Sequence, residues 1–425
     1  MGVVSDLLKD YRIPRMVKIR QVFDDAHIPP ENIPFSVRNG LSRPAIAKRF
    51  QPGMKIAITV GSRGISNMAL IVKSTADWLK ERGCVPFIVP AMGSHGNATA
   101  EGQERVVRDY GCTPEYTGCE IRSSMETVYI GDTEEGRPVF FDKNAYESDG
   151  VIVLNRVKAH TDFRGPYESG LMKMLAIGLG KQYGAERTHA DGFGVMHQRV
   201  PEYGKAMIRY APIACGIALT ENAYEDTRTI DVLTPEQIIT EEPRILEESK
   251  KYMARILFDD CDVLVVDVMG KNYSGAGMDP NITGRFQVPY ASGGITCKRL
   301  AVLDLSEESH GNACGVGMAD LTTRRLFDKF DMEATYPNCI TNTVVEGMRI
   351  PVVMENDRLV FQACIRTAVG IDREHPRIIR ILNTLNIRDI LISEAMLEEA
   401  NQNPAIEILG EPEEMAFDTN GNLCL

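Results

Sequence analysis

A strand, a glycine-containing turn and an amphipathic helix follow one another early in the chain, and this order constrains the fold more than any other feature. Residues 55–60 (KIAITV) are apolar and rich in β-branched side chains, which predicts a buried strand. A helical pattern spans residues 67–82, and Gly83 is suited to end it. A second apolar strand follows at 85–89. This strand–helix–strand unit predicts a parallel sheet.

Reactive side chains follow the ends of these predicted strands. Arg63 lies in the turn after the first strand, and His95 lies in the loop after the second, where another helix is expected to begin near Thr99. A third predicted strand, residues 150–155 (GVIVLN), leads to His160. In parallel sheets the ligand crevice lies beyond the carboxyl ends of the strands. The sequence therefore predicts one site to which all three strand ends contribute.

The next segment adds a lysine and another histidine. Residues 169–180 (SGLMKMLAIGLG) are small and apolar, with Lys173 as the single charge, and they predict a helical turn close to the same crevice. His189 follows sixteen positions later, so three of only seven histidines belong to this region. An isolated histidine often satisfies a loop backbone, and a lone lysine often extends from a helix to solvent. The gathering of ionisable groups favours a functional site instead.

These residue types are suited to several chemistries. Imidazoles gathered with a lysine favour proton transfer, metal ligation or both. Lys173 in an apolar segment could act as a nucleophile, and Arg63 suits bidentate binding of a carboxylate. The zinc-protease motif H-E-x-x-H and the serine-nucleophile motif G-x-S-x-G are both missing from the sequence.

A second domain is predicted to begin near residue 255. An acidic helical pattern at 234–253 precedes a new strand at 263–268. We therefore expect an N-terminal cofactor-binding domain at 1–255 and a C-terminal domain at 256–425. Both domains are expected to be α/β, and the first is expected to contain a mostly parallel sheet.

The polar loop after the strand at 263–268 is a second candidate face of the site. It contains Lys271 and Arg285, which we regard as candidate substrate contacts. A strand at 300–305 and a helix around 319–330 are expected further along.

Composition excludes some partners. The 47 lysines and arginines are outnumbered by 59 acidic residues, which gives a formal net charge of −12 and disfavours a nucleic-acid or anionic-membrane surface. The chain is 44% hydrophobic and 25% charged, as globular proteins are. No segment resembles a signal peptide or a membrane span. We expect a cytoplasmic protein with a small-molecule partner.

Five motifs together resemble the nickel-dependent lactate racemase family, whose enzymes use a nickel-pincer nucleotide. They are Gly61-Ser62-Arg63, Gly93-Ser94-His95-Gly96, His160 in VKAHTDFRG, Lys173 in SGLMK, and His189. The resemblance covers the first half of the chain well and the second half in outline. It implies two α/β domains with the active site in the cleft between them.

The resemblance also implies a role for each motif. Lys173 would carry the cofactor, pyridinium-3-thioamide-5-thiocarboxylic acid mononucleotide, through a thioamide, and His189 would ligate nickel. His95 and His160 would exchange the hydroxyl proton, while Arg63 would hold the substrate carboxylate. The implied reaction inverts C2 of a 2-hydroxy acid by removal and return of a hydride, with the cofactor providing the hydride chemistry.

The sequence departs from the lactate-type pattern at residues 59–62 and at Leu171. Together with the polar loop that contains Lys271 and Arg285, this favours a substrate larger than lactate, such as a sugar acid. The implied partners are a 2-hydroxy acid and the enzymes of cofactor biosynthesis, and a homo-oligomer is compatible with the chain. The alternatives are a nickel-free binding protein of the same fold and a zinc- or lysine-dependent hydrolase or lyase.

Overall fold

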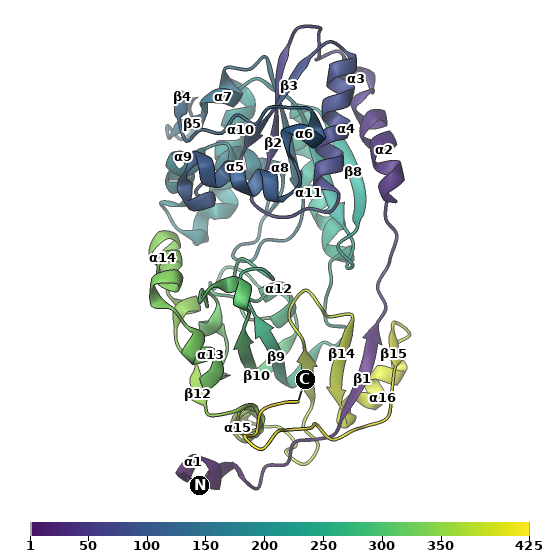
Figure 1. Ribbon diagram of the computed structural model, residues 1–425, viewed down its shortest axis with the longest axis vertical. Helices are drawn as coiled ribbons and strands as arrows, with labels where there is room; N and C mark the ends of the chain where they lie inside the picture. Colours follow the sequence, from purple (N-terminus) through teal and green to yellow (C-terminus); the bar gives the residue numbers. More distant parts are fainter. Residues whose placement is uncertain (1, 425) are drawn as a thin grey trace. The chain divides into compact units, whose positions relative to one another are not determined.

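The computed structural model describes residues 2–424 and divides them into two compact units. Asp24–Met253 form one of them, which we call the site unit. The residues that precede Asp24 and those that follow Met253 form the other, the terminal unit. Each unit is a mixed α/β structure, as the sequence predicts, and the sheet of the site unit is mostly parallel, as expected for the first domain (Figure 1).

The main sheet of the site unit has five strands in the order β3-β2-β6-β7-β8. The first four in this order are parallel and β8 is antiparallel to β7. Their bounds are β2 (Lys55–Val60), β3 (Val85–Pro90), β6 (Gly150–Arg156), β7 (Ile213–Glu221) and β8 (Thr227–Leu233). A separate antiparallel hairpin consists of β4 (Thr127–Asp132) and β5 (Pro138–Asp142).

Helices of the site unit connect and cover these strands. They are α2 (Ile33–Leu41), α3 (Pro44–Ala47), α4 (Met68–Glu81), α5 (Ala100–Asp109), α6 (Pro114–Thr117), α7 (Lys143–Tyr146), α8 (Leu171–Lys173), α9 (Lys181–His189), α10 (Met196–Tyr210) and α11 (Pro235–Tyr252). Between α8 and α9 the chain forms a turn of π-helix, Met174–Gly178.

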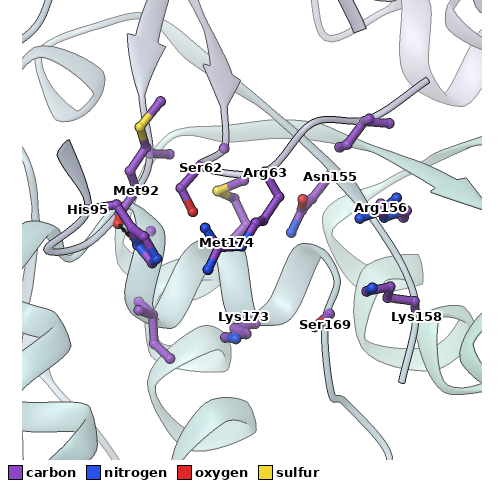
Figure 2. Close-up of a pocket in the computed structure, with 15 residues that line it drawn as sticks. Ser62, Arg63, Met92, His95, Asn155, Arg156, Lys158, Ser169, Lys173 and Met174 are labelled. Carbon is purple, nitrogen blue, oxygen red and sulfur yellow. Dashed lines mark hydrogen bonds between the residues drawn. The ribbon is translucent and has the colours of Figure 1, made fainter. Parts of the chain in front are cut away.

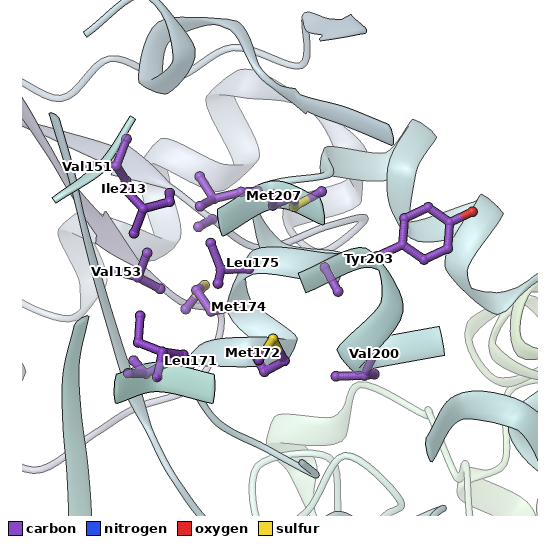
Figure 3. Packing of buried hydrophobic residues seen from close by; sticks show 14 of the residues in the cluster. Val151, Val153, Leu171, Met172, Met174, Leu175, Val200, Tyr203, Met207 and Ile213 are labelled. Atoms are coloured by element: carbon purple, nitrogen blue, oxygen red, sulfur yellow. The ribbon is translucent and has the colours of Figure 1, made fainter. Parts of the chain in front are cut away.

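Both faces of the main sheet are buried, which explains why its strands are almost continuously apolar. Ile56 and Ile58 of β2 point to the face that α2 and α4 cover. Ala57 points to the opposite face, where α8, α10 and α11 pack. Figure 3 shows this second cluster, with Leu171 and Leu175 packed among side chains of β6 and α10. The segment that bears Lys173 is thus anchored in the core.

The sequence prediction for this region is confirmed. β2 has the predicted bounds, β3 extends one residue beyond the predicted strand, and α4 falls inside the predicted helix. The helix expected near Thr99 is α5, which begins at Ala100. The Thr99 side chain caps its N-terminus by accepting a hydrogen bond from the Gly102 backbone N–H.

The terminal unit contains an eight-stranded sheet in the order β12-β11-β10-β9-β13-β14-β1-β15. The strands from β12 to β13 are parallel, and the remaining pairings are antiparallel. Their bounds are β1 (Met16–Gln21), β9 (Asp260–Met269), β10 (Thr296–Leu305), β11 (Leu321–Thr323), β12 (Val352–Met354), β13 (Ile378–Ile381), β14 (Asp389–Ser393) and β15 (Ile406–Ile408). Its helices are α1 (Val3–Leu8), α12 (Pro280–Thr283), α13 (Arg324–Lys329), α14 (Met332–Asn342), α15 (Asp357–Thr367) and α16 (Leu397–Gln402).

Two features of the terminal unit differ from the sequence analysis. The first 23 residues group with this unit rather than with the site unit, because β1 pairs with β14 and β15. The helix expected around 319–330 begins only at Arg324. Residues 321–323 form a strand instead, because they pair with Ala301 and Val302 of the neighbouring β10.

Within residues 2–424, no helix combines the length and the apolar character needed to cross a membrane.

Candidate active site

The candidate site lies at the carboxyl edge of the main sheet in the site unit. β2, β3 and β6 are parallel, so their carboxyl ends point the same way. The chain after these strands contributes Arg63, His95 and Lys158, and all three line one pocket together with Lys173. Figure 2 shows Arg63 between His95 and Asn155, with Lys173 on the helical segment below.

Lys173 is the last residue of α8, at the junction with the π-helical turn. Such turns are rare and occur frequently at functional sites. The flanking Met172 and Met174 are buried, so the apolar sequence fixes the segment while Lys173 keeps partial exposure. Tight packing contributes, since a Cβ at Gly204 would lie 2.1 Å from the sulfur of Met172. The position of the Lys173 backbone therefore depends on α10 as well as on α8.

His160 contacts Lys173 directly. The Nζ atom of Lys173 lies 2.5 Å from Nε2 of His160, and Nδ1 of the same ring accepts the backbone N–H of Asp162 at 3.0 Å. A neutral imidazole whose Nδ1 has the lone pair has its proton on Nε2. Nε2 then donates to the lysine nitrogen, and an amine can accept only when it is uncharged. The hydrogen bonds therefore favour a neutral, nucleophilic Lys173.

The electrostatics shift both groups of the pair towards this protonation state. Burial lowers the pKa of Lys173 from 10.5 to about 8; the carboxylate of Asp162 opposes this change and Arg63 adds to it. Burial, and next the charge of Lys173, hold the pKa of His160 well below its usual range. His160 is thus neutral near pH 7, whereas the neutral form of Lys173 becomes the major one only above about pH 8.

His189 is the last residue of α9. Its Nδ1 lies 2.7 Å from the carbonyl oxygen of Ala185, and since a carbonyl only accepts, Nδ1 carries the proton. The lone pair of the neutral ring is then on Nε2, which is the arrangement typical of a metal-ligating histidine. Burial lowers the pKa of His189, which keeps the ring neutral. Lys173 is close enough to lower it further, so both belong to one neighbourhood.

His95 has the same tautomer as His189 but a different exposure. Its Nδ1 lies 2.9 Å from the carbonyl oxygen of Met92, so Nδ1 donates and Nε2 has the lone pair. The side chain is exposed and lines the pocket. Such an imidazole can accept a proton from a bound hydroxyl group and later return it.

The Arg63 guanidinium lines the pocket and is available to bind an anion. Its guanidinium has no hydrogen-bond or ion-pair partner among residues 2–424, although neighbouring Arg156 is paired with Glu221. Partial removal of the guanidinium from water lowers the pKa of Arg63, while Tyr110 opposes this change and the charge of Arg156 adds to it. The pocket lining contains no carboxylate. This excess of positive charge is suited to a negatively charged ligand, and a guanidinium can bind a carboxylate through two hydrogen bonds.

Two buried glutamates shape the site, and sequence reasoning missed both. The Glu168 carboxylate accepts the backbone N–H of His160 at 2.8 Å and ion-pairs with Arg164 and Lys250. It thereby organises the loop that presents the His160 ring. A glutamate eight residues after a candidate histidine carries no distinctive sequence signal.

Glu242 lies beneath the start of α8. Its carboxylate accepts the backbone N–H of Met172 at 2.9 Å and that of Leu171. It is fully buried, and burial raises its pKa to about 8. A Cβ at Gly170 would lie 2.0 Å from Oε1 of Glu242, so this approach requires glycine. Glu242 therefore sets the start of the turn that ends at Lys173.

Lys271 and Arg285, the other candidate substrate contacts, belong to the terminal unit. Lys271 Nζ donates to the carbonyl oxygen of Gly275 at 2.6 Å. The Arg285 guanidinium donates to the Asp320 carboxylate at 3.1 Å and to the carbonyl oxygen of Cys297 at 3.2 Å. Both side chains are thus engaged within their own unit.

The side chains that could ligate a metal indicate which kind of metal site the chain can form. Within residues 2–424, no three or more His, Cys, Asp or Glu side chains are arranged to hold a metal ion. A hydrolytic zinc site needs about three protein ligands. His189 alone, in its metal-binding tautomer beside a nucleophilic lysine, is instead suited to a metal that arrives with other ligands in an organic cofactor.

Comparison with known proteins finds a similarity to one family over the first part of the chain. Residues 9–198 match the family model described as the lactate racemase N-terminal domain, and this range includes the five candidate residues of the site unit, from Arg63 to His189. Residues 9–198 are therefore similar to this domain family, over slightly less than half of the chain. No curated protein sequence matches the chain.

Two solved structures are similar to this chain at low sequence identity. A protein from Thermotoga maritima is 11% identical, with a TM-score of 0.49 over 77% of this chain and 83% of that one. The lactate racemase apoprotein from Thermoanaerobacterium thermosaccharolyticum is 12% identical, with a TM-score of 0.43 over 68% of this chain and 74% of that one.

Proposed function

We propose that the chain is a racemase or epimerase that inverts C2 of a 2-hydroxy acid. The observation that carries the proposal is the hydrogen-bonded pair of Lys173 and His160, with His189 nearby in its metal-binding tautomer. When bound, a nickel-pincer nucleotide supplies the group that accepts the hydride from C2 and returns it. Lys173 would hold this cofactor through a thioamide, and His189 would ligate its nickel.

Arg63 binds the substrate carboxylate in this proposal. Its guanidinium lines the pocket and has unused donors. Fixing the carboxylate keeps the substrate in the site while the bond between C1 and C2 remains free to rotate. Loss of hydride and of the hydroxyl proton gives a planar 2-keto acid. Rotation about the C1–C2 bond would turn the opposite face of the keto acid towards the group that holds the hydride, so that return of the hydride would invert the configuration.

His95 and His160 exchange the hydroxyl proton. Nε2 of His95 has the lone pair and can act as a base without a change of tautomer. His160 makes its hydrogen bond to the free amine of Lys173. A thioamide nitrogen is not basic, so a cofactor bound to Lys173 would remove this acceptor and leave Nε2 of His160 available to the substrate. His160 would act as the second base after its proton moves from Nε2 to Nδ1, and the two histidines would then serve the two enantiomers.

A second part of the proposal concerns the size of the substrate. Lys271 or Arg285 contacts the distal part of an acid larger than lactate, such as a sugar acid. For Arg285 to make this contact, some of its N–H groups must leave Asp320 or a backbone carbonyl and donate to the substrate instead. Unchanged kinetics of Arg285→Ala on a panel of 2-hydroxy acids would remove Arg285 from this part.

The test of the acid–base roles uses His95→Ala and His160→Ala in protein that carries the cofactor. We expect each variant to lose racemisation by about 10²–10⁴-fold, the usual contribution of a positioned acid or base, and to retain the mass addition on Lys173. Racemisation is followed by circular dichroism from each pure enantiomer. Full turnover in both variants would contradict the roles assigned to these histidines.

A further inference from the structure

Lys181, the first residue of α9, has an unusual setting that the proposed reaction does not use. Its side chain is fully buried, and its backbone has φ of 54°, a left-handed conformation that costs non-glycine residues about 1–2 kcal/mol. Burial of an ammonium group is costly unless hydrogen bonds and charge compensate for it. The contacts of the Lys181 ammonium must therefore offset both its burial and the strain of its backbone.

Three oxygen atoms surround the ammonium of Lys181. This number equals the three N–H donors of the group, so each donor has a partner. Lys181 Nζ lies 2.6 Å from the carbonyl oxygen of Pro90 and 2.9 Å from Oε1 of Gln103. Asp142 completes the set with an ion pair at 3.2 Å. Pro90 ends β3, Asp142 ends β5 and Gln103 belongs to α5. One buried cation thus joins three elements.

Gln103 extends this network to the loop that presents His95. It is fully buried, and its Nε2 donates to the carbonyl oxygens of Gly93 at 2.8 Å and of His95 at 3.1 Å. Because Lys181 occupies Oε1, the amide is held with its Nε2 towards the loop. The loop also packs closely on α5, since a Cβ at Gly96 would lie 2.7 Å from the backbone nitrogen of Gln103.

The position of Lys181 in the sequence connects this network to the residues proposed to hold the cofactor. Lys181 is eight residues after Lys173 and eight before His189. The same stretch of chain therefore carries both residues proposed to hold the cofactor and the cation that fixes the loop of His95. Gly93 strengthens this connection, because its N–H donates to the carbonyl oxygen of Gly178 at 3.2 Å.

We propose that Lys181 is a positioning residue that acts through Gln103 to fix the His95 loop against the segment bearing Lys173 and His189. The catalytic meaning of this contact rests on the proposed function, because it assumes that His95 exchanges a proton with the substrate. The contact itself does not depend on that assumption and can be tested in protein without cofactor.

The test compares three variants. Lys181→Met removes the ammonium but keeps an unbranched side chain. Gln103→Glu keeps an acceptor for Lys181 but places a carboxylate oxygen against the two loop carbonyls. Lys205→Met makes the same change as the first variant at an exposed lysine of the site unit and is the matched control. For each we would measure backbone hydrogen exchange over residues 91–103, the mass addition on Lys173, nickel content, kcat and KM.

In Lys181→Met and Gln103→Glu we expect the loop amides to exchange at least about tenfold faster, because the hydrogen bonds that restrain them are lost. kcat should fall by about 10–100-fold, the scale of a misplaced catalytic group, while KM, nickel and the mass addition stay near the values of the unmodified sequence. Lys205→Met should behave like the unmodified sequence.

Unchanged loop exchange in Gln103→Glu would overturn the proposal, and so would unchanged kcat in an enzyme shown to racemise. Gln103→Glu decides the matter if Lys181→Met does not fold, because it retains the buried cation. Failure of the proposed function looks different: the unmodified chain would then show no nickel, no mass addition and no racemisation, while the exchange measurements would still report on the contact.

Discussion

Two arginines in the two units illustrate how a candidate binding residue differs from a structural one. Arg63 follows β2 and has no hydrogen-bond or ion-pair partner among residues 2–424. Arg285 follows α12 and donates to Asp320 and to two backbone carbonyls. Both are arginines in loops of a parallel α/β sheet, yet only the first leaves its donors for a ligand. A charged group left unpaired in a concave setting is typical of functional sites.

The largest effect is expected from Arg63→Ala. We expect a loss of about 2–5 kcal/mol in transition-state binding, roughly 30- to 5,000-fold in kcat/KM, because the substrate carboxylate loses its partner. The thermal midpoint should stay unchanged, since Arg63 stabilises no other residue. The measurement is kcat/KM for several 2-hydroxy acids, together with a thermal melt. A lowered melting point with normal kinetics would reverse the assignment of Arg63.

A smaller effect, on stability alone, is expected from Glu242→Gln. The folded pKa of Glu242, about 8, lies above its ordinary value of 4.5, so the folded state binds the extra proton between these two pH values. Stability from this group is therefore present at low pH and is lost as the pH rises towards 8, at about 1.4 kcal/mol for each pKa unit. Glutamine cannot ionise but can still accept the N–H of Met172.

Denaturant unfolding at pH 5 and at pH 9 checks this prediction. The glutamine variant should match the unmodified sequence at pH 5 and be more stable at pH 9. A variant that is less stable at pH 9 would mean that the buried carboxylate is ionised and well stabilised in the folded state.

The smallest effect is expected from Arg285→Ala. The Asp320 pair is partly exposed, so its loss should reduce stability by about 1 kcal/mol or less. Lactate should react at its normal rate, and acids with a longer polar chain should react a few-fold more slowly if Arg285 contacts their distal part. The measurement is kcat/KM of Arg285→Ala for acids of increasing length, compared with the values of Arg63→Ala for the same acids. A loss on lactate as large as that of Arg63→Ala would erase the distinction between the two arginines.

Local pattern predicted the strands and helices of the site unit that carry the candidate site. The apolar runs at 55–60, 85–89 and 150–155 mark strands because both faces of the sheet are buried. Since the strands are parallel, their ends also indicate where Arg63 and His95 meet.

What the sequence could not reveal depends on contacts between distant segments. β1 joins the terminal unit because it pairs with strands more than 350 residues away, a pairing that no local pattern encodes. Glu242 reads as one of several acids in a solvated helix, and only its approach to Gly170 distinguishes it. Lys181 likewise reads as an ordinary helix-start lysine until the fold brings Gln103 and Asp142 around it.

The central claim is that Lys173 holds a nickel-containing cofactor with His189 as a ligand. The most direct test is the intact mass and nickel content of protein co-expressed with the enzymes of pincer-cofactor biosynthesis, beside Lys173→Arg as the control. We predict a mass addition located on Lys173 with about one nickel per chain, and neither in the arginine variant. An unmodified Lys173 without nickel under the same conditions would contradict the account.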